Sequence, residues 1–248
     1  MTFKERLDKL NELVAKSNHI VFFGGAGVST ESGIPDFRSK DGLYNQHDVQ
    51  FDQYSPEYLL SHSCLRDHPD VFFEFYRQKL DCRTIEPNVT HKVLADMEAA
   101  GKLACVVTQN IDGLHQKAGS KTVAELHGTT FENYCPKCGE SYPADYIFEC
   151  DEAIPHCKHC GGIVRPRVTL YEENLPEADW NLANYHMHNA DLIIVGGTSL
   201  SVYPAASLVV GRSCPIVLIN KDATDMPRLK TAITFNESLG EVFGKIKY

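Results

Sequence analysis

The stretch His19-Ile20-Val21-Phe22-Phe23-Gly24-Gly25-Ala26-Gly27 decides the fold, because an apolar run ends there in a cluster of glycines. Such a run, followed at once by a glycine turn, is typical of a buried strand in a parallel sheet. Ahead of it, Thr2-Phe3-Lys4-Glu5 forms a capping box, and apolar residues recur at helical spacing at Phe3, Leu7, Leu10 and Val14. We therefore predict an amphipathic helix over residues 3–16 that packs on the sheet.

An apolar run that ends in polar or glycine residues returns three more times, at residues 103–107, 192–195 and 215–219. Segments of helical length separate the four runs. This alternation predicts an α/β fold of the Rossmann-like kind, a parallel sheet with helices on both faces. Open parallel sheets bind ligands at the carboxyl ends of their strands, so we expect the site there.

Two stretches interrupt the alternation. Residues 41–76 are rich in aromatic residues, Asp and His, with Pro56 and Pro69 as breakers, and predict short helices and loops. Residues 128–167 hold two cysteine pairs and little helical periodicity, which indicates an inserted zinc-ribbon module. The two inserts would form a small domain beside the large one, within one catalytic unit over residues 1–248. The large domain would then comprise residues 1–40, 77–127 and 168–248.

Composition and charge exclude several classes of protein. The 248 residues carry a net charge of −9, and the 24 Lys and Arg residues are scattered, so no surface for direct nucleic-acid binding is expected. No apolar run approaches the roughly 20 residues that span a bilayer. The N-terminus leads into an amphipathic pattern instead of a signal peptide. We therefore expect a cytoplasmic protein with no membrane partner.

Two C-x-x-C pairs give the most specific single signal in the chain. Cys135-Pro136-Lys137-Cys138 and Cys157-Lys158-His159-Cys160 are separated by 18 residues. This spacing is typical of a zinc ion held by four thiolates, which leaves no open coordination position, so the ion would be structural. Cys150, His156 and His159 are competing ligands, but each would break the paired geometry.

The remaining cysteines are isolated in the sequence. Without a signal peptide a disulfide framework is not expected. We predict instead that each is a small buried apolar side chain. They are Cys64, Cys82, Cys105, Cys150 and Cys214.

The glycine turn itself, from Gly24 to Gly33, is open to two interpretations. Its glycines would let the backbone approach a pyrophosphate, and a helix beginning after them would supply donors. A dinucleotide fingerprint would, however, place a third glycine where Thr30 stands, so an ordinary dehydrogenase turn fits poorly. On its own the stretch fits a plain strand-to-helix turn equally well.

Three further groups of residues suggest chemistry. In Ile34-Pro35-Asp36-Phe37-Arg38 the aromatic ring could shield a reacting carbon and the arginine could hold a phosphate, although a core Phe and a solvated Arg are the alternative. The polar cluster Thr108-Gln109-Asn110-Ile111-Asp112 follows a strand and could bind ribose hydroxyls and a carboxamide. His127, in Glu125-Leu126-His127-Gly128, is expected at another strand end, just before the zinc module. It suits a general base, with His115 as its competitor.

Taken together, these motifs resemble those of the sirtuin family. The shared stretches occur in the family's order between residues 24 and 206, almost the whole catalytic core. They are Gly25-Ala26-Gly27-Val28-Ser29, Gly33-Ile34-Pro35-Asp36-Phe37-Arg38, Thr108-Gln109-Asn110-Ile111-Asp112, Glu125-Leu126-His127-Gly128, both cysteine pairs, Arg165-Pro166, Gly197-Thr198-Ser199-Leu200 and Val202-Tyr203-Pro204-Ala205-Ala206.

The resemblance implies that NAD and an acyl-lysine meet in a cleft between the two domains. It implies His127 as the catalytic base, with Asn110 and Asp112 as further catalytic residues. By position, the NAD contacts would be Ala26, Thr30, Phe37 and Arg38 in the cofactor loop, Gln109, Asn110, Ile111, Asp112 and His127 around the ribose and nicotinamide, Thr198, Ser199 and Asn220 at the adenosine half, and Ser238 and Leu239 at the adenine.

The reaction that the resemblance implies consumes NAD. The acyl oxygen of the substrate attacks the anomeric carbon of the nicotinamide ribose, nicotinamide leaves, and an imidate results. His127 then deprotonates a ribose hydroxyl, which attacks this imidate. The products are free lysine and O-acyl-ADP-ribose. The rival hypotheses are a mono-ADP-ribosyltransferase on the same scaffold and a zinc-ribbon binding module without chemistry.

The sequence departs from the family pattern at two places. Where the family has Phe-Gly-Glu in the strand that pairs with the substrate, this chain has Tyr171-Glu172-Glu173. Residues 168–173, from Val168 through Glu173, are still expected to add a strand to the bound acyl-lysine peptide. The Tyr-x-x-Arg pair of sirtuins that accept succinyl or malonyl lysine reads Tyr44-Asn45-Gln46-His47 here. We therefore predict a preference for acetyl or other uncharged acyl groups.

Overall fold

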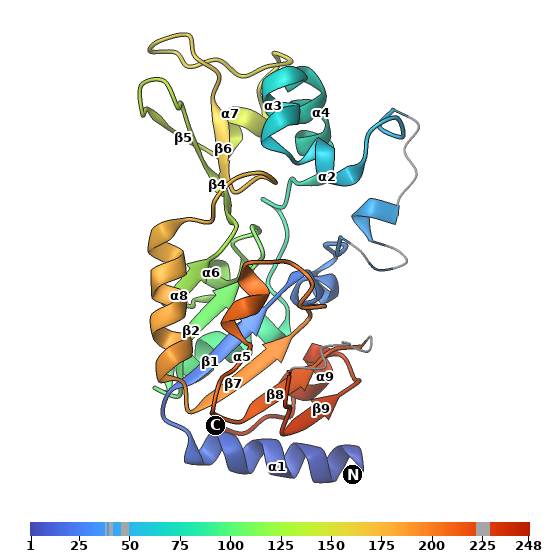
Figure 1. Cartoon of the computed structure of the whole chain (residues 1–248), viewed down its shortest axis with the longest axis vertical. Helices are drawn as coiled ribbons and strands as arrows, with labels where there is room; N and C mark the ends of the chain where they lie inside the picture. Colours follow the sequence, from blue (N-terminus) through green and yellow to red (C-terminus); the bar gives the residue numbers. More distant parts are fainter. Residues whose placement is uncertain (38, 40–41, 46–49, 222–228) are drawn as a thin grey trace.

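The first helix forms as its sequence predicts. The computed structural model describes residues 1–37, 39, 42–45, 50–221 and 229–248 (Figure 1). Helix α1 (Phe3–Lys16) begins at the capping box, in which the Thr2 amide donates to Glu5 (2.7 Å) and the Glu5 amide donates to the Thr2 hydroxyl (3.3 Å). Its buried residues Leu10 and Val14 face the sheet. The Lys102 ammonium donates to carbonyls at the helix C-terminus and satisfies groups that the helix leaves unpaired.

A six-stranded parallel sheet, in the order β3-β2-β1-β7-β8-β9, carries the larger lobe. All four predicted apolar strands are present. Of the two short edge strands, β3 ends two residues before His127, where a strand end was expected, and β9 was not predicted. The strands are β1 (Ile20–Gly24), β2 (Leu103–Thr108), β3 (Val123–Glu125), β7 (Leu192–Gly196), β8 (Ile216–Ile219) and β9 (Ile233–Phe235). The two central ones, β1 and β7, are buried at every residue, as expected for strands covered on both faces.

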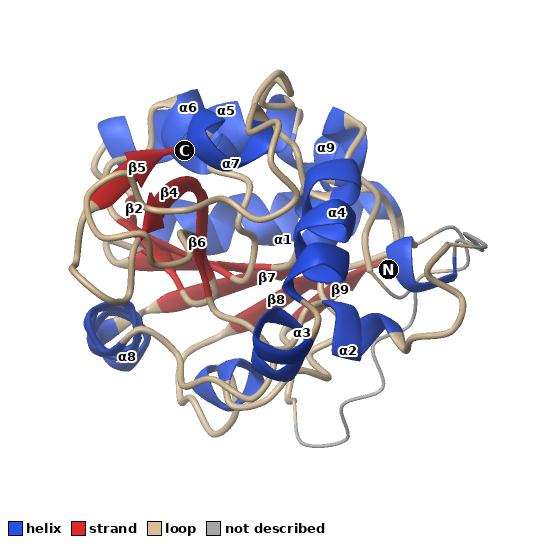
Figure 2. Cartoon of the chain, turned by 90° about the horizontal axis from the view of Figure 1, so that it is seen from above, coloured by secondary structure: helices blue, strands red, loops and turns tan. Residues whose placement is uncertain are grey.

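Helices cover both faces of this sheet, as predicted (Figure 2). On one face lie α1, α5 (Val89–Ala99), α6 (Leu114–Ala118) and α9 (Leu239–Phe243). On the other face α8 (Glu177–Asn189) and the 3-10 helix η4 (Ala205–Leu208) pack against the alternate residues of the strands. Within the described residues, none of the helices has both the length and the apolar character that a membrane span requires.

A smaller lobe stands above the carboxyl edge of the sheet (Figure 1). It contains an antiparallel sheet in the order β5-β4-β6, made of β4 (Gly128–Tyr134), β5 (Ser141–Pro143) and β6 (Arg165–Val168). Its helical part comprises η3 (Leu43–Asn45), α2 (Pro56–Leu59), α3 (His62–Asp67), α4 (Pro69–Lys79) and α7 (Asp145–Phe148). Phe72, Phe73 and Ile147 pack together in a core that joins the helices to the sheet.

The two prolines expected to act as breakers instead start helices. Pro56 begins α2 and Pro69 begins α4. The first turn of a helix needs no donor from its first residue, and the fixed φ of proline suits it. Helix α4 then continues to Lys79, beyond the predicted end of the insert at residue 76.

The chain passes from the large sheet to the small lobe at Gly128, immediately after His127. Gly128 has φ of 73°, and a Cβ atom there would collide with the carbonyl oxygen of Arg167 in β6. The Thr169 amide donates to the His127 carbonyl at 2.8 Å across the same crossing. Glycine is therefore required both by its backbone conformation and by the approach of β6.

We predict that Gly128→Ala is much more destabilising than Gly101→Ala. Gly101 also has φ of 73°, but no atom lies within 4 Å of a Cβ placed there. Both changes strain the backbone, and only Gly128→Ala must also displace β6, which adds about 1–3 kcal/mol. Urea unfolding of the two variants measures this difference. Equal losses would show that the approach of β6 imposes no constraint.

Candidate active site

A cavity of about 440 Å³ lies between the carboxyl edge of the large sheet and the small lobe. Its large-lobe wall includes the glycine turn after β1, the segment after β2, and the turn after β7. Its other wall includes residues 168–173 and Leu60, the residue that follows helix α2. The cavity therefore lies where ligands bind in open parallel sheets, the place where the sequence predicted a site.

Two glycine turns cross at the floor of this cavity. The Gly27 amide donates to the Gly197 carbonyl at 2.9 Å, and a Cβ on Gly27 would lie 2.7 Å from the Gly197 Cα. Gly197 itself has φ of 61°. Only glycines allow the turns after β1 and β7 to approach this closely, and the approach leaves backbone atoms of Gly25 and Gly27 on the cavity wall.

The α-helix expected after the glycine turn is absent. Two 3-10 turns stand there instead, η1 (Ala26–Val28) and η2 (Thr30–Ser32). Gly33, at φ of 93°, ends the second turn, and Pro35 follows two residues later. A proline disfavours helical conformation in the preceding residue, so the segment has no room for a full helix.

The polar cluster after β2 is held by a buried serine. The Ser29 hydroxyl donates to Asp112 at 2.6 Å and accepts from the Asn110 amide at 3.0 Å. Asp112 also accepts from the Leu114 amide at 3.0 Å. Burial raises the pKa of Asp112, and these hydrogen bonds act in the opposite direction. Ser29 was not predicted as a site residue. Its place in the sequence, between the glycines and Phe37, could have indicated a role in the site.

A second contact joins the β2 and β7 segments. The Gln109 side chain donates to the Thr198 hydroxyl at 3.1 Å, and the same hydroxyl accepts from the Leu200 amide. Ser199 and Asn220 complete this side of the cavity. Three segments far apart in sequence therefore present polar groups to one space.

His127 lies on the cavity wall, between β3 and β4. Its Nδ1 is 2.9 Å from the carbonyl oxygen of Gln109. A carbonyl can only accept, so Nδ1 carries the proton and Nε2 carries the lone pair in neutral imidazole. This tautomer is the one a base acting through Nε2 needs.

The competing histidine, His115, is excluded from this role by its position. It is 1% exposed, lies beside His91 with ring centroids 4.7 Å apart, and lines neither cavity. Burial lowers its pKa well below the usual value. His115 therefore belongs to the core between α5 and α6.

Glu125, two residues before His127, titrates near neutrality. Burial raises its pKa to about 7, while a hydrogen bond with Gln116 acts in the opposite direction. A histidine has a similar ordinary pKa. A pH profile of this protein therefore needs a Glu125 variant before it can be assigned to His127.

A smaller cavity of about 130 Å³ adjoins the first and shares five lining residues with it: Ala26, Phe37, Leu80, Asn110 and Ile111. Asp112 lies on its wall. Cys82, predicted only as a buried apolar residue, is also there, with its sulfur 3.3 Å from the Thr130 hydroxyl. Nothing in the sequence around Cys82 indicated this position.

The predicted catalytic and cofactor residues divide into four groups, one of which is Asp112 alone, on the wall of the smaller cavity. The first lines the larger cavity: Ala26, Phe37, Gln109, Asn110, Ile111, His127, Thr198, Ser199 and Asn220. Three others line neither cavity: Thr30 donates to the Gly27 carbonyl, Ser238 caps α9, and Leu239 is 5% exposed in the core. Arg38 lies outside the described residues, as do Gln46 and His47.

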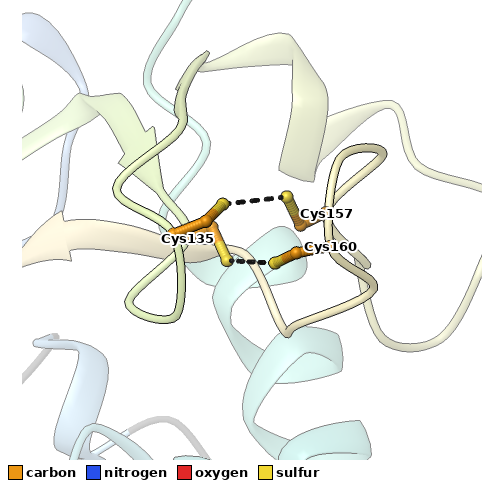
Figure 3. A group of neighbouring side chains, drawn as sticks. Cys135, Cys157 and Cys160 are labelled. Atoms are coloured by element: carbon orange, nitrogen blue, oxygen red, sulfur yellow. Dashed lines mark hydrogen bonds between the residues drawn. The ribbon is translucent and has the colours of Figure 1, made fainter.

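Four cysteines converge in the small lobe, as predicted. The sulfurs of Cys135, Cys138, Cys157 and Cys160 all lie within 4.8 Å of one another. Cys135 is 3.5 Å from Cys160, and Cys138 is 3.6 Å from Cys157, with the sulfurs of the two loops facing each other (Figure 3). A tetrahedral zinc ion with Zn–S bonds of about 2.3 Å places its sulfurs about 3.8 Å apart, so the group fits this ion.

The other candidate ligands lie outside this group. His156 contacts Glu152, and neither Cys150 nor His159 belongs to the converging set. Among the isolated cysteines, three are buried as predicted: Cys64, Cys82 and Cys105. Cys150 and Cys214 are only half-buried, because each lies in a loop at the surface, so that prediction was wrong for these two.

Residues 168–173, the segment predicted to pair with a substrate peptide, are partly committed to internal pairing. The Tyr171 amide donates to the Leu60 carbonyl, and the Leu170 amide donates to the Glu173 carboxylate. Within the described part of the chain, the backbone groups of Glu172 and Asn174 have no hydrogen-bond partner. Unpaired backbone groups therefore lie at residues 172–174, at the end of the predicted segment.

Glu173 fixes this segment through hydrogen bonds from Arg165 and from the Leu170 amide. It accepts two hydrogen bonds from the Arg165 guanidinium, at 2.5 and 2.9 Å. Burial alone would raise its pKa, but Arg165 and the Leu170 amide lower it to about 2. The pair is partly buried and bidentate, so it fixes the direction of the chain after β6.

Comparison with known proteins gives one consistent result. Residues 25–204 match the model of the Sir2 family. The chain is 50% identical to an NAD-dependent protein deacetylase of Clostridium tetani over 96% of its own length and 95% of the relative's. A deacetylase of the same description from Clostridium perfringens is 49% identical over 98% of each chain.

Solved structures agree with these relatives. A complex of Sir2, a p53 peptide and NAD+ superposes with a TM-score of 0.84 and 35% identity, covering 99% of this chain and 97% of that one. A Sir2 structure bound to a propionylated peptide gives 0.84 and 34%, over 99% and 97%.

We predict that Cys135→Ala abolishes stoichiometric zinc binding and lowers the melting temperature. Loss of a structural metal is among the few single changes that lower the free energy of unfolding by more than about 4 kcal/mol. For a chain of this length, that loss lowers the melting temperature by on the order of 10 °C. Metal analysis and thermal unfolding measure both effects. Cys150→Ala is the matched control and should retain the metal. Unchanged zinc content in the Cys135 variant would refute the four-thiolate site.

Proposed function

Because this chain belongs to the Sir2 family, we propose that its cleft removes acetyl and other uncharged acyl groups from protein lysines and consumes NAD. The observation that carries the proposal is that one cavity brings together the glycine turn, the polar cluster after β2 and the His127 imidazole. The products would be nicotinamide, O-acyl-ADP-ribose and free lysine.

The residues around the cavity fit NAD by their chemistry. Glycine backbone atoms on the wall suit the approach of a pyrophosphate, with Ala26 and Phe37 beside them. Gln109, Asn110, Ile111 and Asp112 would bind the ribose and nicotinamide, and Thr198, Ser199 and Asn220 the adenosine half. Asn110 and Asp112 are 8% and 6% exposed, so their polar groups keep a fixed orientation. Contacts from Thr30, Arg38, Ser238 and Leu239 remain predictions from the resemblance.

His127 would act as the general base. With Nδ1 donating to the Gln109 carbonyl, Nε2 takes a proton from a ribose hydroxyl, and the carbonyl stabilises the imidazolium that results. The hydroxyl then attacks the bound acyl group. Ser29 acts indirectly, since it holds Asn110 and Asp112 in place.

The zinc ion would have a purely structural role. Its four thiolates leave no position for substrate, and they join the loop after β4 to the loop before β6. Those two strands flank the crossing at Gly128, so the metal supports the wall that carries residues 168–173.

The acylated peptide would bind as an added strand at residues 168–173. Backbone hydrogen bonds give such a strand its affinity, and the groups of Glu172 and Asn174 are available for them. The modified lysine would then extend into the cavity beside Val168 and Tyr171.

We predict that His127→Ala lowers kcat/KM for deacetylation about 10²- to 10⁴-fold, the usual contribution of a positioned general base. Nicotinamide release and peptide deacetylation should be measured together, and the wild type should give equal amounts. His188→Ala, at an exposed position in α8, is the control and should match the wild type.

Retained deacetylation in the His127 variant would show that another group is the base. Transfer of labelled ADP-ribose to protein without deacetylation would favour the ribosyltransferase instead. Glu125→Gln belongs in the same pH series, because any step near pH 7 that survives in this variant is not due to Glu125.

We also predict that acetyl-lysine peptides react at least about tenfold better than succinyl-lysine peptides of the same sequence. Burying a carboxylate in the cleft without an opposite charge costs more than about 1.4 kcal/mol, which is a tenfold effect. Competition between the two peptides in one reaction measures the ratio. A preference for succinyl-lysine would contradict the prediction.

A further inference from the structure

Glu172 occupies a position that the family pattern assigns to glycine. Its φ is 75°, in the left-handed region that glycine adopts freely and a glutamate adopts only under strain. The backbone there has the shape that a glycine would give. The chain therefore keeps the glycine conformation while adding a carboxylate to the cleft wall.

The strained residue is held by its own side chain. Glu172 Oε2 accepts hydrogen bonds from the Ser63 amide at 2.9 Å and from the Ser63 hydroxyl at 2.8 Å. Ser63 lies in the first turn of α3, where amides have no partner within the helix. These contacts compensate for the strain and fix where the carboxylate lies.

Within the described residues, Glu172 forms hydrogen bonds to Ser63 but no ion pair. Glu173 next to it is fully engaged by Arg165, by the Leu170 amide and by His62. The guanidinium of Arg66 interacts electrostatically with Glu172. Its hydrogen bonds, two of 2.7 Å, go to Asp67 instead. Within the described residues, Oε1 of Glu172 has no hydrogen-bond partner.

This exposed negative charge lies at the backbone edge that can receive a peptide. Neither the amide nor the carbonyl of Glu172 or Asn174 has a hydrogen-bond partner among the described residues. A peptide bound there would place residues next to its modified lysine close to the Glu172 carboxylate, since strand residues are only about 3.3 Å apart. The net charge of −9 adds a field of the same sign.

We propose that Glu172 is a specificity-determining residue that selects peptides with a lysine or arginine flanking the acyl-lysine. The inference rests on the proposed function and names its substrate class. An exposed pair of opposite charges contributes modestly, so we expect kcat/KM to differ about two- to fivefold between a basic and a neutral flanking residue. An acidic flanking residue is disfavoured by repulsion.

The test uses acetyl-lysine peptides that differ only by Lys, Gln or Glu at one flanking position, scanned on both sides. The full-length wild type should prefer Lys over Glu at one or more positions, mainly through KM, and this preference should shrink at high salt. E172Q can keep the hydrogen bonds to Ser63 through its amide oxygen but has no charge, so its Lys/Glu ratio should fall towards one.

Two further variants keep the experiment decisive. E172G restores the family residue and removes the strain, so it should lose the preference as E172Q does, even if E172Q proves unstable. E177Q removes an acid from the exposed first turn of α8, outside the cavity, and should keep the wild-type ratio.

An unchanged Lys/Glu ratio in E172Q and E172G would overturn the inference and leave the proposed function intact. An equal loss in E177Q would also overturn it, because the effect would then come from net charge. A wild type that deacetylates none of the peptides would instead overturn the proposed function.

Discussion

The close crossing of two backbone turns, at Gly27 and Gly197, is the constraint on which the cleft depends. Because β1 and β7 are neighbouring parallel strands, their carboxyl ends emerge together and their turns must pass within hydrogen-bond distance. Any Cβ at this crossing would push the turns apart. The turn after β1 would then lose its position beside Asn110, and Ser29 could no longer bridge to Asp112. Backbone packing at two glycines thus determines the geometry of side chains that come from three distant segments.

The wall of the cleft that the small lobe forms depends on side-chain interactions instead of close backbone packing. The small lobe has only modest apolar cores of its own, and charged or metal-binding groups supplement them. Four cysteine sulfurs from two loops converge with the spacing of one metal site, and the partly buried Arg165–Glu173 pair fixes the chain that leaves β6. A pair of this kind contributes little net stability, but it leaves a buried charge if either partner is lost, and this makes one chain path strongly preferred. The large lobe therefore supplies a rigid floor, and the small lobe supplies a wall whose shape is set by specific polar contacts.

How far sequence could predict this structure depended on whether a signal was local. The helix at 3–16 and the four apolar strands carry their periodicity within a few residues, so they were predicted closely. Strand β9 is three residues long and exists through pairing with β8, which no local pattern reveals. The converging cysteines were predictable because their spacing encodes the geometry. Cys82 was not, because only tertiary packing brings it to the smaller cavity.

The residues of the cleft wall also suggest how affinity for a peptide can be separated from specificity for its sequence. A peptide that binds as an added strand is held through groups common to all peptides, so this part of the interaction cannot distinguish one sequence from another. Discrimination must come from side chains beside the open edge. A glycine there would supply the backbone geometry without strain, and it would be neutral towards the peptide. A glutamate in the same conformation keeps the backbone groups available and adds a charge, and its bonds to Ser63 compensate for the strain. One residue can thus change which peptides are preferred while the arrangement around His127 stays the same.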